Sequence, residues 1–178
     1  TPTVLSADQL CAVMRAVRES FDISAVSEYT VEAGRPDTVT REKLDVIRSF
    51  GASRVSVNPQ TMDDAVLRRI GRRHKAEQTL EAAALVRQAG GLSLNMDLIA
   101  GLPGDTPAGF ADSLSKVLAC GPENVTVHTL AVKRAARVGS VGETGTSAQA
   151  AQEMLAHAEK TLRDAGFHPY YLYRQRNM

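Results

Sequence analysis

The stretch Asn95-Met-Asp-Leu-Ile-Ala-Gly-Leu-Pro-Gly-Asp-Thr-Pro107 decides the fold. It reads as the end of a buried strand, Leu92–Ile99, followed by a glycine-rich loop and a helix that opens at Thr106 with Pro107 in its first position. Asp97 lies near the C-terminal end of this strand, which is the edge where open and barrel-type parallel sheets place their ligands. We interpret the rest of the chain as further strand–loop–helix units arranged around that edge.

Composition and charge narrow the class of protein. The chain has 178 residues, 43% of them hydrophobic, which fits one domain with a real core. Lys and Arg number 21 against 20 acidic residues, and this balance argues against a general nucleic-acid or anionic-membrane binder. No apolar run approaches the ~20 residues of a membrane span. The two cysteines, Cys11 and Cys120, form neither a disulfide framework nor a metal-ligand spacing, so we expect a cytoplasmic protein.

Strands and helices are expected to alternate along the chain. The expected strands are Glu28–Glu32, Arg54–Asn58, Leu92–Ile99, Asn124–Leu130 and a last one around Tyr170–Tyr173. Helices are expected after the Ser6–Gln9 capping box, at Leu44–Phe50, after Thr61–Asp64, at Ala76–Ala89, from Thr106 and after Ser147. The loop Lys133–Thr146 is long for a compact domain. The alternation predicts a parallel sheet with right-handed crossovers in one α/β domain, or a large piece of one.

Four of the strands alternate between apolar and polar side chains, which is unusual for parallel strands covered on both faces. One face carries Tyr29, Val31, Val55, Val57, Leu94, Met96, Leu98, Val125 and Val127. The other carries Thr30, Glu32, Ser56, Asn58, Ser93, Asn95, Asp97, Thr126 and His128. Helices should cover the apolar face, and the polar face should line a wet or ligand-filled space such as the inside of an open barrel. A solvated antiparallel sheet would also alternate, but the intervening helices argue against it.

Three polar side chains are expected at the C-terminal edge of the sheet: Glu32, Gln60 and Asp97. A carboxylate at this edge can accept hydrogen bonds from two ribose hydroxyls or pair with a ligand ammonium group. The alternative, which the residues leave open, is that Glu32 and Asp97 form structural salt bridges with nearby cations, namely Arg35, Arg54 or Arg72.

Other groups have simple structural interpretations beside their functional ones. The basic turn Arg72–Lys75 could bind a carboxylate or phosphate, but a solvated turn is the simpler interpretation. The Gly101–Asp105 loop matches neither a Walker loop nor a dinucleotide fingerprint, so its glycines are expected to supply turn geometry. His128 is open to proton transfer, ligand binding or a structural hydrogen bond. The two cysteines are expected to be packing residues.

An ordered set of short motifs resembles the oxygen-independent coproporphyrinogen III oxidase family of radical S-adenosylmethionine (SAM) enzymes, and within it the HemZ-like coproporphyrinogen dehydrogenase branch. The resemblance covers essentially the whole chain. The motifs are Thr1–Thr3, Glu28–Asp37, Arg54–Gln60, Ile70–His74, Asn95–Gly104 and His128–Ala136.

The resemblance implies an incomplete (β/α) barrel with a wide polar mouth that binds SAM. At matching motif positions the SAM contacts would be Thr1, Glu32, Gln60, Arg72, Asp97 and, through its backbone, Ala131. It also implies a [4Fe-4S] cluster held by a CxxxCxxC motif, which this sequence does not contain. We therefore expect residues 1–178 to be an internal piece of one barrel domain, with the cluster-binding strand and the C-terminal domain outside it. Such a piece alone is not expected to cleave SAM.

The function that the resemblance implies for the whole protein is oxidative decarboxylation of two propionates of coproporphyrinogen III, giving protoporphyrinogen IX in heme biosynthesis. Its partners would be the porphyrinogen substrate and an electron donor such as flavodoxin or ferredoxin. Lys133, Arg134 or Arg137 are expected to meet substrate carboxylates. The alternative within the same superfamily is a heme chaperone with nearly the same barrel motifs, and a cofactor-free scaffold domain is a third reading.

Overall fold

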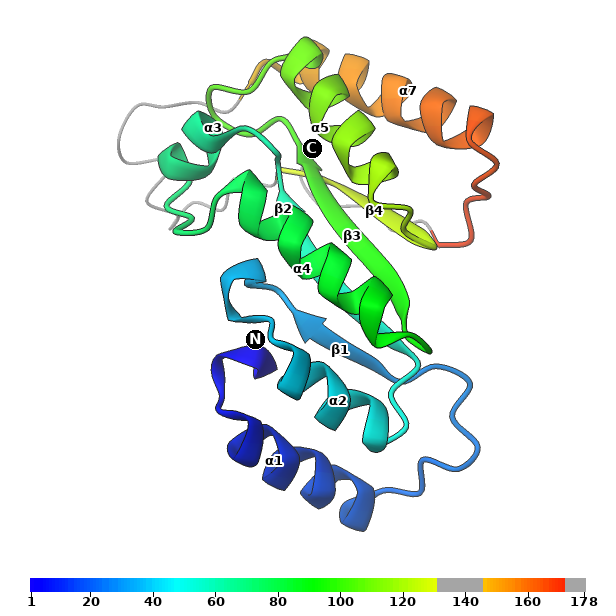
Figure 1. Cartoon of the computed structure of the whole chain (residues 1–178). Helices are drawn as coiled ribbons and strands as arrows, with labels where there is room; N and C mark the ends of the chain where they lie inside the picture. The colour runs from blue at the N-terminus through cyan, green and yellow to red at the C-terminus, as the bar shows by residue number, and fades with distance from the viewer. Residues whose placement is uncertain (131–145, 172–178) are drawn as a thin grey trace.

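The structure of the protein is a computed structural model that describes residues 1–130 and 146–171. Strands and helices alternate along the chain (Figure 1). The strands are β1 (Thr30–Ala33), β2 (Arg54–Gln60), β3 (Ser93–Ala100) and β4 (Asn124–Thr129). The helices are α1 (Ala7–Ser20), α2 (Arg41–Ser49), α3 (Asp64–Arg69), α4 (Ala76–Ala89), α5 (Pro107–Ala119) and α7 (Ala148–Asp164), with short 3-10 turns η1 (Pro2–Val4) and η2 (Pro36–Thr38). None of the helices in these ranges is long and apolar enough to cross a membrane.

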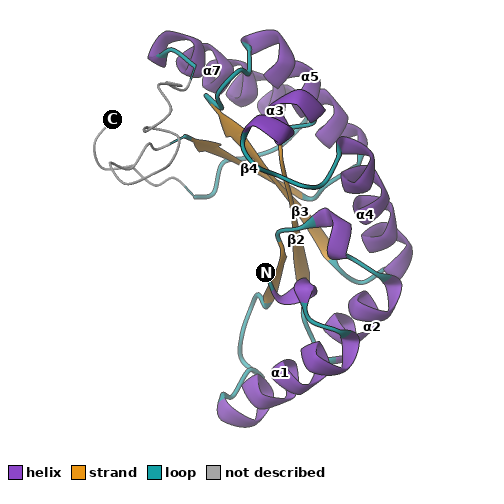
Figure 2. Cartoon of the chain, turned by 90° about the vertical axis from the view of Figure 1, so that its left-hand side faces the viewer, coloured by secondary structure: helices purple, strands orange, loops and turns teal. Residues whose placement is uncertain are grey.

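The strands form one parallel sheet in the order β1-β2-β3-β4. The predicted α/β class with a parallel sheet is confirmed. Helices lie along one side of this sheet and form an outer arc, while none of the helices in the described ranges lies against the other side (Figure 2). Because each strand runs in the same direction, the C-terminal ends of all four strands meet at one edge.

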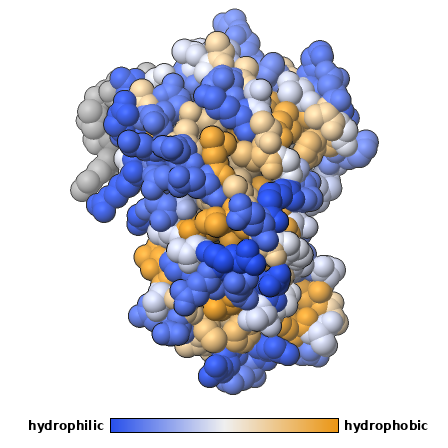
Figure 3. Space-filling model, viewed as in Figure 1, coloured by the Kyte–Doolittle hydropathy of each residue, from blue (hydrophilic) through white to orange (hydrophobic). Residues whose placement is uncertain are grey.

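The alternation of apolar and polar side chains along the strands explains why the described helices cover only one face of the sheet. The largest fully buried side chains include Val55, Leu94, Met96 and Leu98 on the sheet and Leu44, Ile47, Phe110 and Leu114 on the helices. Alternate strand residues point away from this core and are polar. The predicted division into a helix-covered apolar face and an uncovered polar face is confirmed. Hydrophilic side chains cover much of the outer helical surface, with hydrophobic ones showing between them (Figure 3).

Capping chemistry sets several helix boundaries where the sequence places them. The Ser6 side chain accepts a hydrogen bond from the Gln9 backbone N–H, and the Gln9 side chain accepts one from Ser6, which is the predicted capping box. Thr106 caps α5 through the N–H of Gly109, and Ser147 caps α7 through the N–H of Ala150. Each cap satisfies a donor that would otherwise lack a partner in the first helical turn.

The predicted last strand is wrong where the structure describes it. Tyr170 and Tyr171 are exposed and belong to no strand. Instead of pairing with β4, this segment is held by its side chain, because the Tyr170 hydroxyl accepts hydrogen bonds from Arg54 (3.2 Å) and Asn124 (3.0 Å). Residues 172 and 173 of the predicted strand, and residues 133–145 of the predicted long loop, lie outside the described ranges.

Candidate functional site

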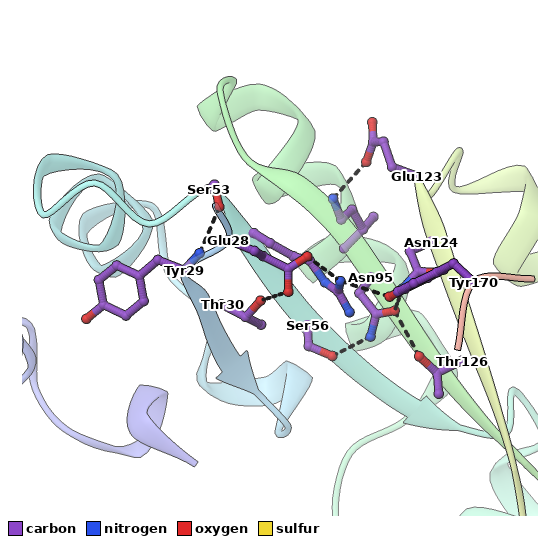
Figure 4. Close-up of polar contacts among 12 residues, drawn as sticks. Glu28, Tyr29, Thr30, Ser53, Ser56, Asn95, Glu123, Asn124, Thr126 and Tyr170 are labelled. Atoms are coloured by element: carbon purple, nitrogen blue, oxygen red, sulfur yellow. Dashed lines mark hydrogen bonds and ion pairs between the residues drawn. The ribbon is translucent and has the colours of Figure 1, made fainter. Parts of the chain in front are cut away.

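A hydrogen-bonded network of polar side chains crosses the uncovered face of the sheet (Figure 4). The strand register places Ser56 of β2 beside Asn95 of β3, and Asn95 beside Asn124 of β4. Residues in register on one face have side chains close enough to bond, and these three do. The network occupies the face that the described helices leave free, so it lines the concave side of the sheet.

Asn95 is the centre of this network. Its side-chain NH₂ group donates to Ser56 Oγ (2.6 Å) and to Asp97 Oδ1 (2.6 Å). Its carbonyl oxygen accepts from Asn124 Nδ2 (2.8 Å) and Thr126 Oγ1 (3.0 Å). Both donors and both acceptor positions of the amide are therefore used, although only 2% of the residue is exposed. A fully satisfied buried amide fixes the positions of the groups around it.

Asp97 is positioned by this amide on one side and faces a histidine on the other. Its Oδ1 is bound by Asn95, and its Oδ2 lies 3.8 Å from Nε2 of His128 on β4. The pKa of His128 is raised above its ordinary value, first by interaction with the Asp97 carboxylate and more weakly by the charge of Glu32, while burial opposes the shift. The Asp97 side chain is 13% exposed and that of His128 is 31% exposed, so both remain within reach of a ligand.

Glu32 joins the same face from β1. Its Oε2 accepts a hydrogen bond from Asn58 Nδ2 (3.3 Å), and Ser56 Oγ donates to Asn58 Oδ1 (3.0 Å), which links Glu32 to the network. Thr1 lies close by: a Cβ added at Gly34 would stand 3.1 Å from Thr1 Oγ1 and 3.6 Å from Asn58 Nδ2. The structure thus brings Thr1, Glu32 and Asp97, which were predicted from distant segments, to one connected edge.

Gln60 ends β2 in an unusual backbone conformation. Its φ is 69°, the one positive value among the described non-glycine residues, and the register between β2 and β3 shifts between Val57 and Gln60. The side chain turns back and donates to the carbonyl of Asn58 (3.4 Å), and the residue is 6% exposed. Backbone strain of this kind occurs at ligand-binding edges, where a bulge re-aims a side chain.

The basic turn after α3 splits into exposed and buried parts. Arg72 is exposed, and in the described ranges its guanidinium makes no hydrogen bond or ion pair. His74 is buried and its Nε2 lies 3.3 Å from the Pro59 carbonyl oxygen, so the interpretation of this turn as wholly solvated is wrong at His74. Burial lowers the pKa of His74, and the positive charge of Arg72 acts in the same direction. Ala131, Lys133, Arg134 and Arg137 lie outside the described residues.

The salt-bridge alternative for the two carboxylates is wrong. Arg35 pairs with Asp37 (2.6 Å) and Arg54 pairs with Glu28 (2.8 Å), while Glu32 and Asp97 are joined to amides and to His128 instead. Both carboxylates are therefore held by groups that leave an oxygen for a ligand.

A cavity of about 620 Å³ lies at the opposite edge of the sheet, where the strands begin. Its lining includes Glu28, Ser53, Arg54, Asn124 and Tyr170. At this end Arg54 pairs with Glu28 and donates a hydrogen bond to the Tyr170 hydroxyl, so these side chains already have partners within the protein. Because parallel α/β sheets bind ligands at the C-terminal strand ends, the edge with Glu32 and Asp97 is the candidate ligand site rather than this cavity.

Sequence reasoning missed the network that carries the site. Asn95 and Ser56 were placed on the polar face, but nothing in their spacing marked them as bonded partners. The sequence showed only that Asn95 and Ser56 are polar residues in the middle of their strands. The closeness of His128 to Asp97 depends on the β3–β4 register, which pairs Ile99 with His128.

The donor set at this edge fits SAM. Two carboxylates that form no ion pair with Arg or Lys among the described residues can accept hydrogen bonds from ribose hydroxyls or an ammonium group, and the exposed Arg72 presents a fork suited to a ligand carboxylate. The described residues do not form a binding site for an iron–sulfur cluster. Within residues 1–130 and 146–171, no three His, Cys, Asp or Glu side chains are grouped to hold a metal.

Comparisons with known proteins identify the family. The family model for the Radical SAM superfamily matches residues 7–117. The HemZ "oxygen-independent coproporphyrinogen-III oxidase-like protein" of Bacillus subtilis is 41% identical over 181 residues, covering 100% of this chain and 36% of the relative. The heme chaperone HemW of the same organism is 35% identical over 137 residues, covering 75% of this chain and 35% of the relative.

A solved structure gives the same result. Coproporphyrinogen III oxidase (HemN) of Escherichia coli, described as a radical SAM enzyme, matches with a TM-score of 0.83 and 28% identity. The match covers 94% of this chain and 39% of that one. The chain therefore spans about a third of the length of the curated relatives it matches.

Proposed function

The chain belongs to the radical SAM superfamily, and we propose that the full-length protein is an oxygen-independent coproporphyrinogen III dehydrogenase. It would convert two propionates of coproporphyrinogen III to vinyl groups, giving protoporphyrinogen IX. Each propionate would lose CO₂, one hydrogen atom, which the chemistry of bound SAM would take up, and one further electron, which would pass to an electron acceptor. The observation that carries this proposal is the 41% identity with B. subtilis HemZ across the whole chain. The polar edge with Glu32 and Asp97, which the described helices leave uncovered, supports a cofactor site there.

In this proposal SAM, with a [4Fe-4S] cluster held by residues outside this sequence, supplies the radical chemistry when bound. The residues of this chain bind and orient the cofactor. Glu32 and Asp97 accept hydrogen bonds from its hydroxyl or ammonium groups, and Arg72 pairs with its carboxylate. Thr1, Gln60 and the backbone at Ala131 complete the contacts. Holding the cofactor in one orientation lowers the entropic cost of reaching the transition state, and this is the main contribution of these residues.

Substitution of the two carboxylates, Glu32 and Asp97, tests the proposed cofactor site. In the full-length protein, Glu32→Ala and Asp97→Ala should each weaken SAM binding about tenfold or more, because each removes a charged acceptor from a partly dry site. Isothermal calorimetry measures this directly. Glu123→Ala, which alters a carboxylate at the other edge of the sheet, is the matched control. Wild-type affinity in both site variants would refute the assignment.

The reaction itself is tested by an anaerobic assay. Reconstituted full-length protein, SAM, a reductant and coproporphyrinogen III should yield 5′-deoxyadenosine together with protoporphyrinogen, detected after oxidation as protoporphyrin fluorescence. A low-potential protein such as flavodoxin or ferredoxin is the proposed natural donor. This chain alone should give neither product, because its two cysteines, Cys11 and Cys120, do not form the CxxxCxxC motif.

A heme chaperone is the second candidate. The identity of 35% with B. subtilis HemW favours it, although that match covers 75% of the chain rather than all of it. A chaperone would bind heme stoichiometrically and pass it to an apoprotein without decarboxylating the porphyrinogen. Heme transfer without protoporphyrinogen formation would replace the first proposal with the second.

A further inference from the structure

One oxygen of the Asp97 carboxylate is bound by Asn95, and His128 stands beside the other. Asn95 donates to Oδ1 at 2.6 Å, and this amide cannot move without breaking its other three hydrogen bonds. Oδ2 accepts no hydrogen bond from Asn95, so both of its lone pairs can face an incoming group. Nε2 of His128 lies 3.8 Å from it. That distance is short enough for strong attraction between charges and too long for a full hydrogen bond.

The surroundings of His128 favour a competition for that oxygen. Among the described groups, the charges that act on its ring are those of Asp97 on β3 and Glu32 on β1, both negative. On the other face of β4, α7 packs with the buried apolar side chains Met154 and Ala158. The pKa of His128 is raised accordingly, so a larger share of the rings is protonated near neutral pH than for an ordinary histidine.

We propose that His128 is a positioning residue that competes with SAM for Oδ2 of Asp97, so that the cofactor binds more tightly when the imidazole is neutral. This inference rests on the proposed SAM site. A protonated imidazole pairs with Oδ2 and occupies the acceptor that a ribose hydroxyl or ammonium group needs. When the proton leaves, the attraction between ring and carboxylate falls, and Oδ2 becomes available to the ligand. Binding must then be accompanied by release of a proton from His128 at pH values where the ring is protonated.

The test compares the pH dependence of SAM binding to full-length wild type and to His128→Gln. From about pH 5.5 to about pH 8.5, a range that spans the titration of histidine, the wild-type Kd should fall relative to that of His128→Gln. The limiting slope is about tenfold per pH unit, which corresponds to one proton released per ligand. Titration of SAM itself affects both proteins equally and cancels in the ratio. Gln keeps a polar side chain of similar reach and cannot become positively charged.

His157→Gln is the matched control, because His157 is exposed on α7 and lies away from the site. It should keep the wild-type slope. Calorimetry of the wild type in two buffers of different ionisation enthalpy gives a second readout, since released protons change the measured heat. That readout remains available if His128→Gln does not fold.

The outcomes separate the two proposals. Equal pH slopes for wild type and His128→Gln, or no proton release by the wild type below pH 7, overturn the competition while leaving the SAM site intact. Wild-type affinity in Asp97→Ala and Glu32→Ala overturns the site itself, and the competition with it. A slope present in wild type and His157→Gln but lost in His128→Gln supports the inference.

Discussion

Asn95 Nδ2 donates a 2.6 Å hydrogen bond to Oδ1 of Asp97, two residues further along the same face of β3. The contact joins a buried amide to the carboxylate at the candidate cofactor edge. It means that the orientation of Asp97 is set by the interior of the sheet, through Ser56, Asn124 and Thr126, rather than by solvent. In the proposed cofactor site, stability and ligand binding would therefore both depend on Asn95.

Replacing Asn95 with Ala should lower the free energy of unfolding by about 1–3 kcal/mol, because it removes four hydrogen bonds of a buried amide that joins three strands. The measurement is the midpoint of urea unfolding followed by circular dichroism. Ser93→Ala is the control: Ser93 starts the same strand, points to the same face and is exposed, so its loss should change stability by no more than about 0.5 kcal/mol. Equal effects of the two substitutions would contradict the network.

Local chemistry explains why much of the fold could be predicted. The helix at Ala76–Ala89 and the caps at Ser6 and Thr106 depend on neighbouring residues in the sequence, and the structure has them at the predicted positions. Strand parity depends on residues two apart, and it correctly indicated which face the helices leave free. These features need no knowledge of which strand lies beside which.

Register and backbone irregularity explain what was missed. The bonds from Asn95 to Ser56 and Asn124 exist because three strands align at those residues, and alternation fixes the face but not the alignment. The closeness of His128 to Asp97 has the same origin. The prediction of a last strand was wrong because the residues around Tyr170 are typical of strands. Instead, the Tyr170 hydroxyl accepts hydrogen bonds from Arg54 and Asn124 at the edge where the strands begin.

Gln60 should tolerate Gly better than Val. Its φ of 69° lies in the left-handed region, where a Cβ costs about 1–2 kcal/mol and a β-branched side chain costs more. Gln60→Gly removes the whole side chain yet relieves this cost, so its unfolding midpoint should stay at or above that of Gln60→Val. Thermal and urea unfolding of both variants decide the order. A more stable Val variant would show that the bulge does not constrain this position.

His74 should make the protein less stable as the pH falls. Burial lowers its pKa in the folded state, so the unfolded chain takes up a proton first, near the ordinary histidine pKa of about 6.5. The stability contributed by neutral His74 is therefore fully present above that pH and is lost as the pH falls toward the folded-state pKa. His74→Gln should flatten this part of the curve of unfolding free energy against pH. His157→Gln, on the exposed face of α7, should leave it unchanged, and a curve that keeps its slope in His74→Gln would exclude His74 as the cause.

Asp105 should show the opposite pH dependence, because its carboxyl group is buried without enough partners. Its Oδ1 accepts from the Thr106 N–H (2.8 Å), whereas Oδ2 has no hydrogen-bond partner within the described ranges, and the residue is 6% exposed. Burial raises the pKa of Asp105 in the folded state, and the charge of Asp63 acts in the same direction. As the pH rises above the unfolded-state value of about 3.9, the unfolded chain ionises first, so this residue's contribution to stability declines through its folded-state pKa.

Asp105→Asn keeps an oxygen for Thr106 and removes the ionisation. Its unfolding free energy, minus that of the wild type, should therefore increase between about pH 4 and about pH 7. Asp112→Asn serves as the control, because Asp112 is an exposed partner of Lys116 on α5, with a side chain 60% exposed. Ionising a buried carboxyl oxygen that has no hydrogen-bond partner costs free energy. A difference between Asp105→Asn and wild type that stays constant with pH would therefore contradict a raised pKa for Asp105.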